Sequence, residues 1–203
     1  MVEQASIRVS EEEYLEKYAA DFYEWVDGEL LPMSPIQLDH DVLQDYVRDW
    51  LKQYLRLKPI GQVVGAPFVM RLGGRYREPD LQVILHDNPG ELTNTGMLGA
   101  ADICIEIVSP ESVERDYADK LSEYQQGGVR EYWIFDLKRK DSRFHRLNAT
   151  GTYTIIEPNV DGNYSTPLLP RFQLPVSTLW LEEKPDTLAI IAALRKLLAD
   201  EPS

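Results

Sequence analysis

Residues 102–136 read DICIEIVSPESVERDYADKLSEYQQGGVREYWIFD and contain the clearest secondary-structure pattern of the chain. Asp102–Val108 is nearly all apolar, which predicts a central strand, and Arg130–Asp136, rich in Tyr, Trp, Ile and Phe, predicts another buried strand. Between them, Val113–Gln126 predicts a helix that ends at Gly127-Gly128, because glycine closes helices most easily. A strand, a returning helix and a second buried strand together predict an α/β domain.

The chain before this stretch adds a long helix and further strands. Apolar residues recur at three- and four-residue steps between Ile36 and Leu57, which predicts one amphipathic helix. Gln62–Arg71 and Leu81–Leu85 are β-type runs bounded by turn residues. The order helix, three strands, helix, strand is therefore the predicted backbone of the domain.

Shorter elements are expected at the N-terminal side. Ser10 followed by three acidic residues is an N-cap pattern and predicts a short helix over Ser10–Phe22. Asp27-Gly28 is a strong turn dipeptide and predicts a hairpin over Tyr23–Leu31.

The pattern changes beyond residue 140 to short strands and turns. Phe144–Leu147 and Tyr153–Ile156 predict strands, and Thr187–Ala199 predicts a final helix with an apolar stripe of Leu188, Ile191, Leu194 and Leu198. We therefore expect one domain over residues 1–203, with its core at about 23–140 and a C-terminal extension at 141–203.

Composition limits the class of protein and its partners. A chain of 203 residues with 43% apolar residues can bury a sizeable core. Cys104 is the only cysteine, which suits a reducing cytoplasm, and no apolar run is long enough to cross a membrane. The net charge of −13 argues against a protein that coats nucleic acid, so any contact with DNA must be local.

One acidic residue directly precedes a predicted strand, and another lies inside the next one. Asp80 stands at the head of Leu81–Leu85, and Glu106 lies inside Asp102–Val108, where a carboxylate is costly to bury unless it is paired or binds a metal. Neighbouring strands lie about 4.8 Å apart, so the two carboxylates can share one cation, and an all-oxygen site suits Mg²⁺ or Mn²⁺. The alternative is that Glu106 points off the sheet and pairs with an arginine.

Lys120 is the cation that the pattern associates with these acids. Asp116, Lys120 and Tyr124 form an i, i+4, i+8 row on one helix face. Aimed at the site, the Lys120 ammonium would orient water or balance charge on a phosphorane. An ordinary surface ion pair between Asp116 and Lys120 is the alternative, and spacing alone leaves both open.

Two basic clusters are candidates for the local DNA contact. One contains Arg71, Arg75 and Arg77, and the other is Lys138-Arg139-Lys140. Scattered surface charge that serves solubility is the alternative for each cluster. Other kinds of site are not indicated, because one cysteine and three scattered histidines form no zinc pattern and no phosphate-binding glycine loop is present.

Four runs in order resemble the Uma-type restriction-endonuclease-like proteins of the PD-(D/E)XK nuclease superfamily: DGELLPMSPIQLDH (27–40), REPDLQVI (77–84), CIEIVSPES (104–112) and DYADKLSEYQQGGVREYWIFD (116–136). The resemblance implies a central mixed sheet flanked by helices. It matches Asp80 and Glu106 to the acidic signature residues. Val108 stands where the superfamily has its lysine, and the resemblance implies that Lys120 has taken over that role. Glu29 and His40 also match motif positions, as possible helpers or as structural residues.

The leading hypothesis from these observations is a metal-dependent endonuclease that hydrolyses DNA phosphodiester bonds. Asp80, Glu106 and the main-chain carbonyl of Ile107 would hold Mg²⁺ or Mn²⁺, while Lys120 positions the water. A catalytically silent nuclease fold that serves as a binding module is the alternative. A cutter of double strands needs two symmetric sites, so we also expect a homodimer.

Overall fold

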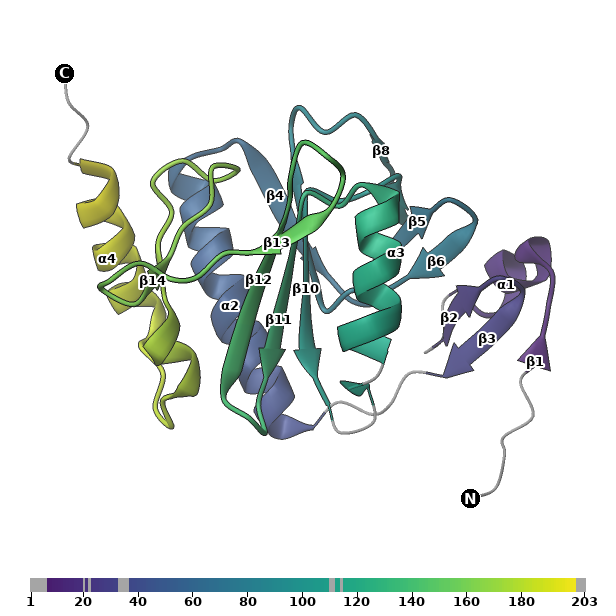
Figure 1. The fold of residues 1–203 in the computed structure, drawn as a ribbon, viewed down its shortest axis with the longest axis horizontal. Coiled ribbons are helices and arrows are strands. Elements are labelled where there is room, and N and C mark those ends of the chain that lie inside the picture. The colour runs from purple at the N-terminus through teal and green to yellow at the C-terminus, as the bar shows by residue number, and fades with distance from the viewer. Residues whose placement is uncertain are drawn as a thin grey trace.

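The computed structural model of this chain describes residues 7–19, 21, 23–32, 37–109, 112–113 and 115–199. Their elements form a mixed α/β arrangement, as the sequence predicts, in which helices cover both faces of a central sheet (Figure 1). A second sheet, formed mostly by the N-terminal third of the described residues, lies beyond one of these helices.

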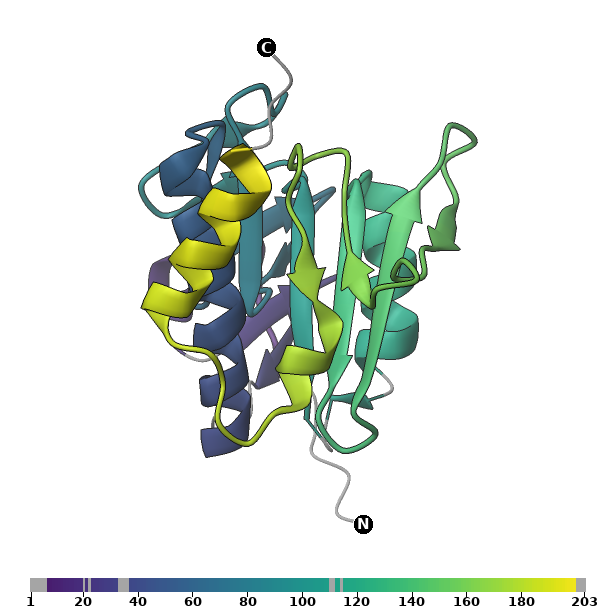
Figure 2. The same ribbon diagram turned by 90° about the vertical axis from the view of Figure 1, so that its left-hand side faces the viewer.

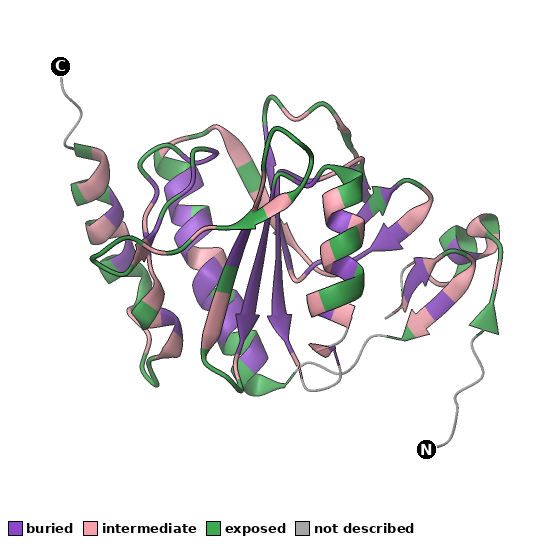
Figure 3. Ribbon diagram, viewed as in Figure 1, coloured by how far each residue is buried: buried purple, intermediate pink, exposed green. Residues whose placement is uncertain are grey.

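The central sheet has the strand order β13-β12-β11-β10-β7-β4. Only the β10–β11 pair is parallel, and the helical segment between these strands provides the crossover that parallel strands need. The buried strands β10 and β11 stand out in Figure 3, and β7 is buried along its whole length as well. The strands are β4 (Gly61–Gly65), β7 (Leu81–Leu85), β10 (Ile103–Val108), β11 (Glu131–Asp136), β12 (Asp141–Leu147) and β13 (Tyr153–Ile155).

Helices divide the two faces of this sheet by the alternation of strand side chains. Ile103, Ile105 and Ile107 face α2 (Leu38–Leu57), whereas Cys104 and Val108 belong to the cluster on the side of α3 (Lys120–Gly127). Glu106 shares the parity of Cys104 and therefore faces α3. The predicted long helix is confirmed from Leu38; Ile36 lies outside the described residues.

The helix predicted over Val113–Gln126 begins with an irregular turn. Arg115–Asp119 forms the π-helical segment η1, and regular α3 starts only at Lys120 and closes on Gly128 with a left-handed φ of 83°. Such π segments widen one turn of a helix and often occur at functional sites. The irregular turn ends at Lys120.

The second sheet has the strand order β1-β3-β2-β6-β5-β9-β8. The predicted hairpin is confirmed, with Asp27 and Gly28 at positive φ between β2 and β3. Ser10 caps α1 as expected, but this helix ends at Lys17, well before Phe22, which lies outside the described residues. The elements are β1 (Ile7–Arg8), α1 (Glu11–Lys17), β2 (Tyr23–Val26), β3 (Glu29–Pro32), β5 (Val69–Leu72), β6 (Arg75–Arg77), β8 (Glu91–Leu92) and β9 (Gly96–Leu98).

One predicted strand was wrong. Gln62–Arg71 is two strands in different sheets, because β4 pairs with β7 whereas β5 pairs with β6 and β9. Pro67 stands between them, and proline cannot donate a hydrogen bond to a strand ladder. The break carries the chain from the central sheet to the second sheet.

The C-terminal residues pack against the α2 side of the core (Figure 2). Phe172 and Leu174 join the same buried cluster as residues of α2. The final helix α4 (Thr187–Ala199) has the predicted bounds, but its buried residues are Ile190 and Leu194, while Leu188 is 76% exposed. The remaining elements are β14 (Asn163–Tyr164), β15 (Leu174–Pro175) and the 3-10 helix η2 (Val176–Trp180). Among the described residues, no helix is long and apolar enough to cross a membrane.

Candidate active site

The candidate site lies at the end of the central sheet where β7 begins and β10 ends (Figure 1). These strands are antiparallel, and their register pairs Leu81 with Ile105. One step further along the same register, Asp80 stands opposite Glu106, so the two carboxylates arrive at the same sheet end. The first turn of α2 and the segment η1 reach this end as well.

The Asp80 side chain is fixed by contacts on one oxygen. The Ile107 main-chain N–H donates to Asp80 Oδ2 at 2.7 Å, and His40 Nε2 lies 3.2 Å from the same oxygen. Gln44 on α2 donates to the Asp80 main-chain carbonyl at 2.7 Å. Because Oδ2 takes both side-chain contacts within the described part of the chain, Oδ1 is left as the oxygen that can bind a further ligand.

His40 lies beside the candidate site through this contact with Asp80. Burial lowers the pKa of the imidazole, but the hydrogen bond and charge of Asp80 outweigh burial, and the pKa of His40 is raised overall. Its Nδ1 is buried without a hydrogen-bond partner in the structure. His40 thus holds Asp80 from the side of α2.

Glu106 is buried and receives a cation from α3. Lys120 Nζ lies 2.8 Å from Glu106 Oε1, and the Tyr124 hydroxyl donates to the same oxygen at 3.0 Å. Burial raises the pKa of Glu106 to about 8, with Lys120 opposing this rise and the charges of Asp80 and Asp116 adding to it. The positive charge of Lys120 is therefore not enough to keep the pKa of Glu106 at its ordinary value.

The Lys120 ammonium is surrounded by carboxylates. Besides Glu106, it lies 3.6 Å from Glu24 Oε1 and 3.6 Å from Asp116 Oδ1, and its side chain is only 4% exposed. Burial lowers the pKa of Lys120, but these three acids outweigh it and raise the pKa overall. Lys120 is charged at neutral pH, and the alternative of an exposed Asp116–Lys120 surface pair is wrong.

Glu24 and Arg77 belong to this network, although the sequence did not single them out for it. Glu24 Oε2 accepts from Arg77 at 2.9 Å, and Glu123 on α3 accepts two further bonds from the same guanidinium at 2.8 Å each. Burial opposes ionisation of Glu24, but Lys120 and Arg77 lower its pKa to about 2. The available signal was an acid inside an apolar strand, the same signal that marked Glu106.

The burial of Arg77 corrects the expected arginine cluster on the surface. The Arg77 side chain is 2% exposed and fully engaged, so it has no free face for DNA. Arg71 and Arg75 are more exposed, and they pair with Glu11 and Asp27.

Glu29 is also placed differently from expectation. It pairs with Arg8 at 2.7 Å on the outer part of the second sheet, and no contact joins it to Asp80, Glu106 or Lys120 among the described residues. The acid that the hairpin delivers to the site is Glu24, on the neighbouring strand.

Glu78 is a second residue that sequence reasoning missed. Both of its carboxyl oxygens are buried without a hydrogen-bond partner, although its own N–H donates to Glu24 at 3.1 Å. Burial and the Glu24 charge raise the pKa of Glu78 to about 8. Together with Glu106, it shows that this end of the sheet holds more acid than its cations neutralise.

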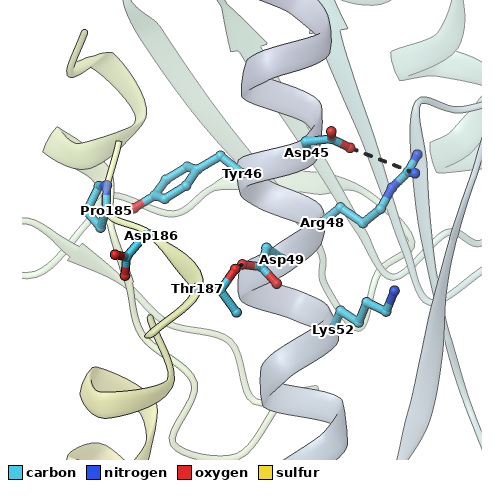
Figure 4. A pocket seen from close by; sticks show the side chains of 8 residues that line it. All are labelled: Asp45, Tyr46, Arg48, Asp49, Lys52, Pro185, Asp186 and Thr187. Atoms are coloured by element: carbon cyan, nitrogen blue, oxygen red, sulfur yellow. Dashed lines mark hydrogen bonds and ion pairs between the residues drawn. The ribbon is translucent and has the colours of Figure 1, made fainter. Parts of the chain in front are cut away.

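A groove of about 440 Å³ lies elsewhere, between α2 and the start of α4 (Figure 4). Both acidic and basic side chains line this groove, and none of the candidate site residues is among them. The lining residues are Asp45, Tyr46, Arg48, Asp49, Lys52, Pro185, Asp186 and Thr187.

Comparisons with known proteins bear on the family and the fold of this chain. A family model named Uma2, described as "Putative restriction endonuclease", matches residues 11–177. The crystal structure of a putative nuclease belonging to DUF820 from Anabaena variabilis ATCC 29413 is similar with a TM-score of 0.64 and 19% identity, over 78% of this chain and 89% of that chain. This likeness confirms the predicted restriction-endonuclease-like fold. A comparison with curated proteins found no match.

Proposed function

This chain belongs to the Uma2 family, and from that premise we propose that it is a metal-dependent endonuclease that hydrolyses phosphodiester bonds in DNA. One observation carries the proposal. Helix α3 brings the Lys120 ammonium to 2.8 Å from Glu106, on the sheet face where a lysine at position 108 would also point. The cation missing from β10 at Val108 is thus supplied from another element.

A divalent ion fits the donors at this end of the sheet. Within the described ranges, no three His, Cys, Asp or Glu side chains are grouped to hold a metal. Mg²⁺, however, is commonly bound by one or two carboxylates with water in its other positions. The unpartnered oxygens of Glu78 and the raised pKa of Glu106 show the excess of acid that such an ion would relieve. Asp80, Glu106 and the Ile107 carbonyl would hold Mg²⁺ or Mn²⁺.

The chain's own residues then have separate roles. A bound ion would polarise the phosphate and favour ionisation of water. Asp80 is pre-oriented by the Ile107 N–H and by His40, so little ordering is left for the moment of binding. The buried Lys120 supplies a fixed positive charge that orients water and offsets the charge developing on the phosphate.

The test is cleavage of supercoiled, linear and single-stranded DNA with Mg²⁺ or Mn²⁺ and with chelator. We expect metal-dependent cleavage by the wild type and none by Asp80→Asn. Asp87→Asn is the matched control, because Asp87 is an exposed aspartate just beyond the opposite end of β7. No cleavage of any DNA form by folded wild-type protein would instead favour a silent nuclease fold that only binds a partner.

The proposal includes a homodimer in the cytoplasm. Two-fold symmetry would place one site on each strand of a duplex, and the buried free thiol of Cys104 suits a reducing compartment. Light scattering at micromolar concentration tests the assembly, and a monomeric mass would refute the dimer.

A further inference from the structure

A group of basic residues emerges beside the candidate site. In the parallel register Val108 pairs with Asp136, so the turn after β11 leaves the sheet at the same end as Glu106. Four exposed cations follow on this turn and on the start of β12, in a chain of net charge −13. We call them the basic turn: Lys138, Arg139, Lys140 and Arg143.

Tyr117 ties the basic turn to the catalytic helix. The guanidinium groups of Arg139 and Arg143 lie 5.8 Å and 4.8 Å from the centre of the Tyr117 ring, and the Tyr117 hydroxyl donates to Asp136 at 3.3 Å. Tyr117 follows Asp116, whose Oδ1 lies 3.6 Å from Lys120 Nζ. The same short segment therefore positions the catalytic lysine and the two arginines.

The two arginines keep donors for a further ligand. Arg139 donates to the Asp136 side chain at 2.9 Å and Arg143 to Asp141 at 3.1 Å, whereas each guanidinium has five N–H groups. The contacts with the Tyr117 ring involve the guanidinium charge rather than particular N–H groups, and a guanidinium fork matches phosphate oxygens. With two acids against four cations, the basic turn has a local surplus of positive charge.

We propose that the basic turn binds the phosphate backbone of DNA next to the scissile bond, an inference that rests on the proposed nuclease function. Two residues of strand advance by roughly 7 Å, and adjacent strands lie about 5 Å apart. At about 3.4 Å of helix rise per nucleotide, the basic turn lies on the order of three nucleotides from the site. Arg71 and Arg75, on the second sheet, are the competing surface.

The test measures duplex DNA binding by fluorescence anisotropy across a salt series, with Ca²⁺ in place of Mg²⁺. For Arg139→Gln/Arg143→Gln we expect about tenfold weaker binding per arginine and a salt slope smaller by about 1.8. Arg195→Gln/Lys196→Gln on α4 is the matched control for charge and should bind like the wild type. Thermal melting checks that each variant is folded.

A second pair, Lys138→Gln/Lys140→Gln, covers the case in which the arginine variant does not fold, and its salt slope should fall similarly. An unchanged slope for the basic-turn variants, a larger loss from Arg71→Gln/Arg75→Gln, or no DNA binding by the wild type would overturn the inference. Cleavage is assayed separately with Mn²⁺. Absence of cleavage refutes the nuclease function, while a reduced slope still supports the binding surface.

Discussion

Two buried glutamates lie toward opposite ends of the central sheet, and their surroundings differ. Glu131, at the start of β11, pairs with Ile103 in the register, whereas Glu106 lies near the end of β10. Glu131 accepts four hydrogen bonds on its two oxygens, from Arg146, Trp133, Tyr164 and Thr166. Among the described residues, Glu106 has Lys120 and Tyr124 as partners, both on Oε1.

The difference separates a structural acid from the acid that we propose as a metal ligand. A carboxylate whose lone pairs are all directed at protein donors is satisfied and holds its surroundings in one arrangement. Glu106 instead has both of its named partners on Oε1, acidic neighbours and a raised pKa, so a cation can take the place of its proton. Glu78, with no partner on either oxygen, belongs with Glu106 in this respect.

The largest expected contrast is in stability. Glu131→Gln leaves the Arg146 cation and three neutral donors facing an amide, and removing one partner of a buried ion pair costs about 3 kcal/mol or more. Glu106→Gln removes a carboxyl whose pKa is raised by burial and by acidic neighbours. We therefore expect its free energy of unfolding to change by no more than about 1 kcal/mol in the absence of metal. Urea denaturation measures both. Equal losses of unfolding free energy would break the comparison.

The second prediction concerns metal and Lys120. Mn²⁺ at about 100 times its Kd should stabilise the wild type by about 2.7 kcal/mol, because it binds only the native state, and Asp80→Asn should lose this gain. Lys120→Ala should keep the gain but cleave DNA about 10²- to 10³-fold more slowly, since the lysine is not a metal ligand.

Thermal midpoints with and without Mn²⁺ and single-turnover cleavage measure the two effects. Lys120→Met, which retains the buried stem of the side chain, serves if the alanine variant does not fold. A melting curve of the wild type that is indifferent to Mn²⁺ would mean that these carboxylates hold no ion.

The sequence was sufficient for the elements of the core but not for the whole site. Strands such as Leu81–Leu85 were found because apolar runs bounded by turns are local signals. Glu24 was missed and Arg77 was assigned to a surface cluster, because their roles depend on the pairing of β2 with β6 in the second sheet and on their contact with α3. No local pattern encodes that contact. Pro67 was the local signal for the split strand, but the exchange between sheets is a tertiary event.

The third prediction is a pH dependence of stability that arises from the candidate site. The pKa values of Glu106 and Glu78 are raised to about 8 from ordinary values near 4.5, so the folded state binds more protons than the unfolded state between these limits. Unfolding free energy contributed by these groups therefore falls as pH rises from about 4.5 to about 8. Glu106→Gln should flatten this fall by about 2 kcal/mol between pH 6 and pH 8.

Denaturation at several pH values without metal measures the slope, and Glu29→Gln, a partly exposed acid on the second sheet, is the control that should keep it. Parallel pH profiles for Glu106→Gln and the wild type would show that the Glu106 carboxyl is ionised in the folded state despite its burial.

The smallest effect compares two tyrosines that serve the two glutamates. The Tyr164 hydroxyl donates to Glu131 at 2.7 Å and the Tyr124 hydroxyl to Glu106 at 3.0 Å, and both rings are fully buried. Phenylalanine keeps each ring and removes only the hydroxyl donor.

Hydrogen bonds to a charged group contribute about 1.5–3 kcal/mol to stability, and hydrogen bonds between neutral groups about 0.5–1.5 kcal/mol. Because its pKa of about 8 leaves Glu106 largely protonated at pH 7, Tyr124→Phe should cost less than Tyr164→Phe in urea denaturation. The reverse order would mean that Glu106 is the charged, structural acid of the two.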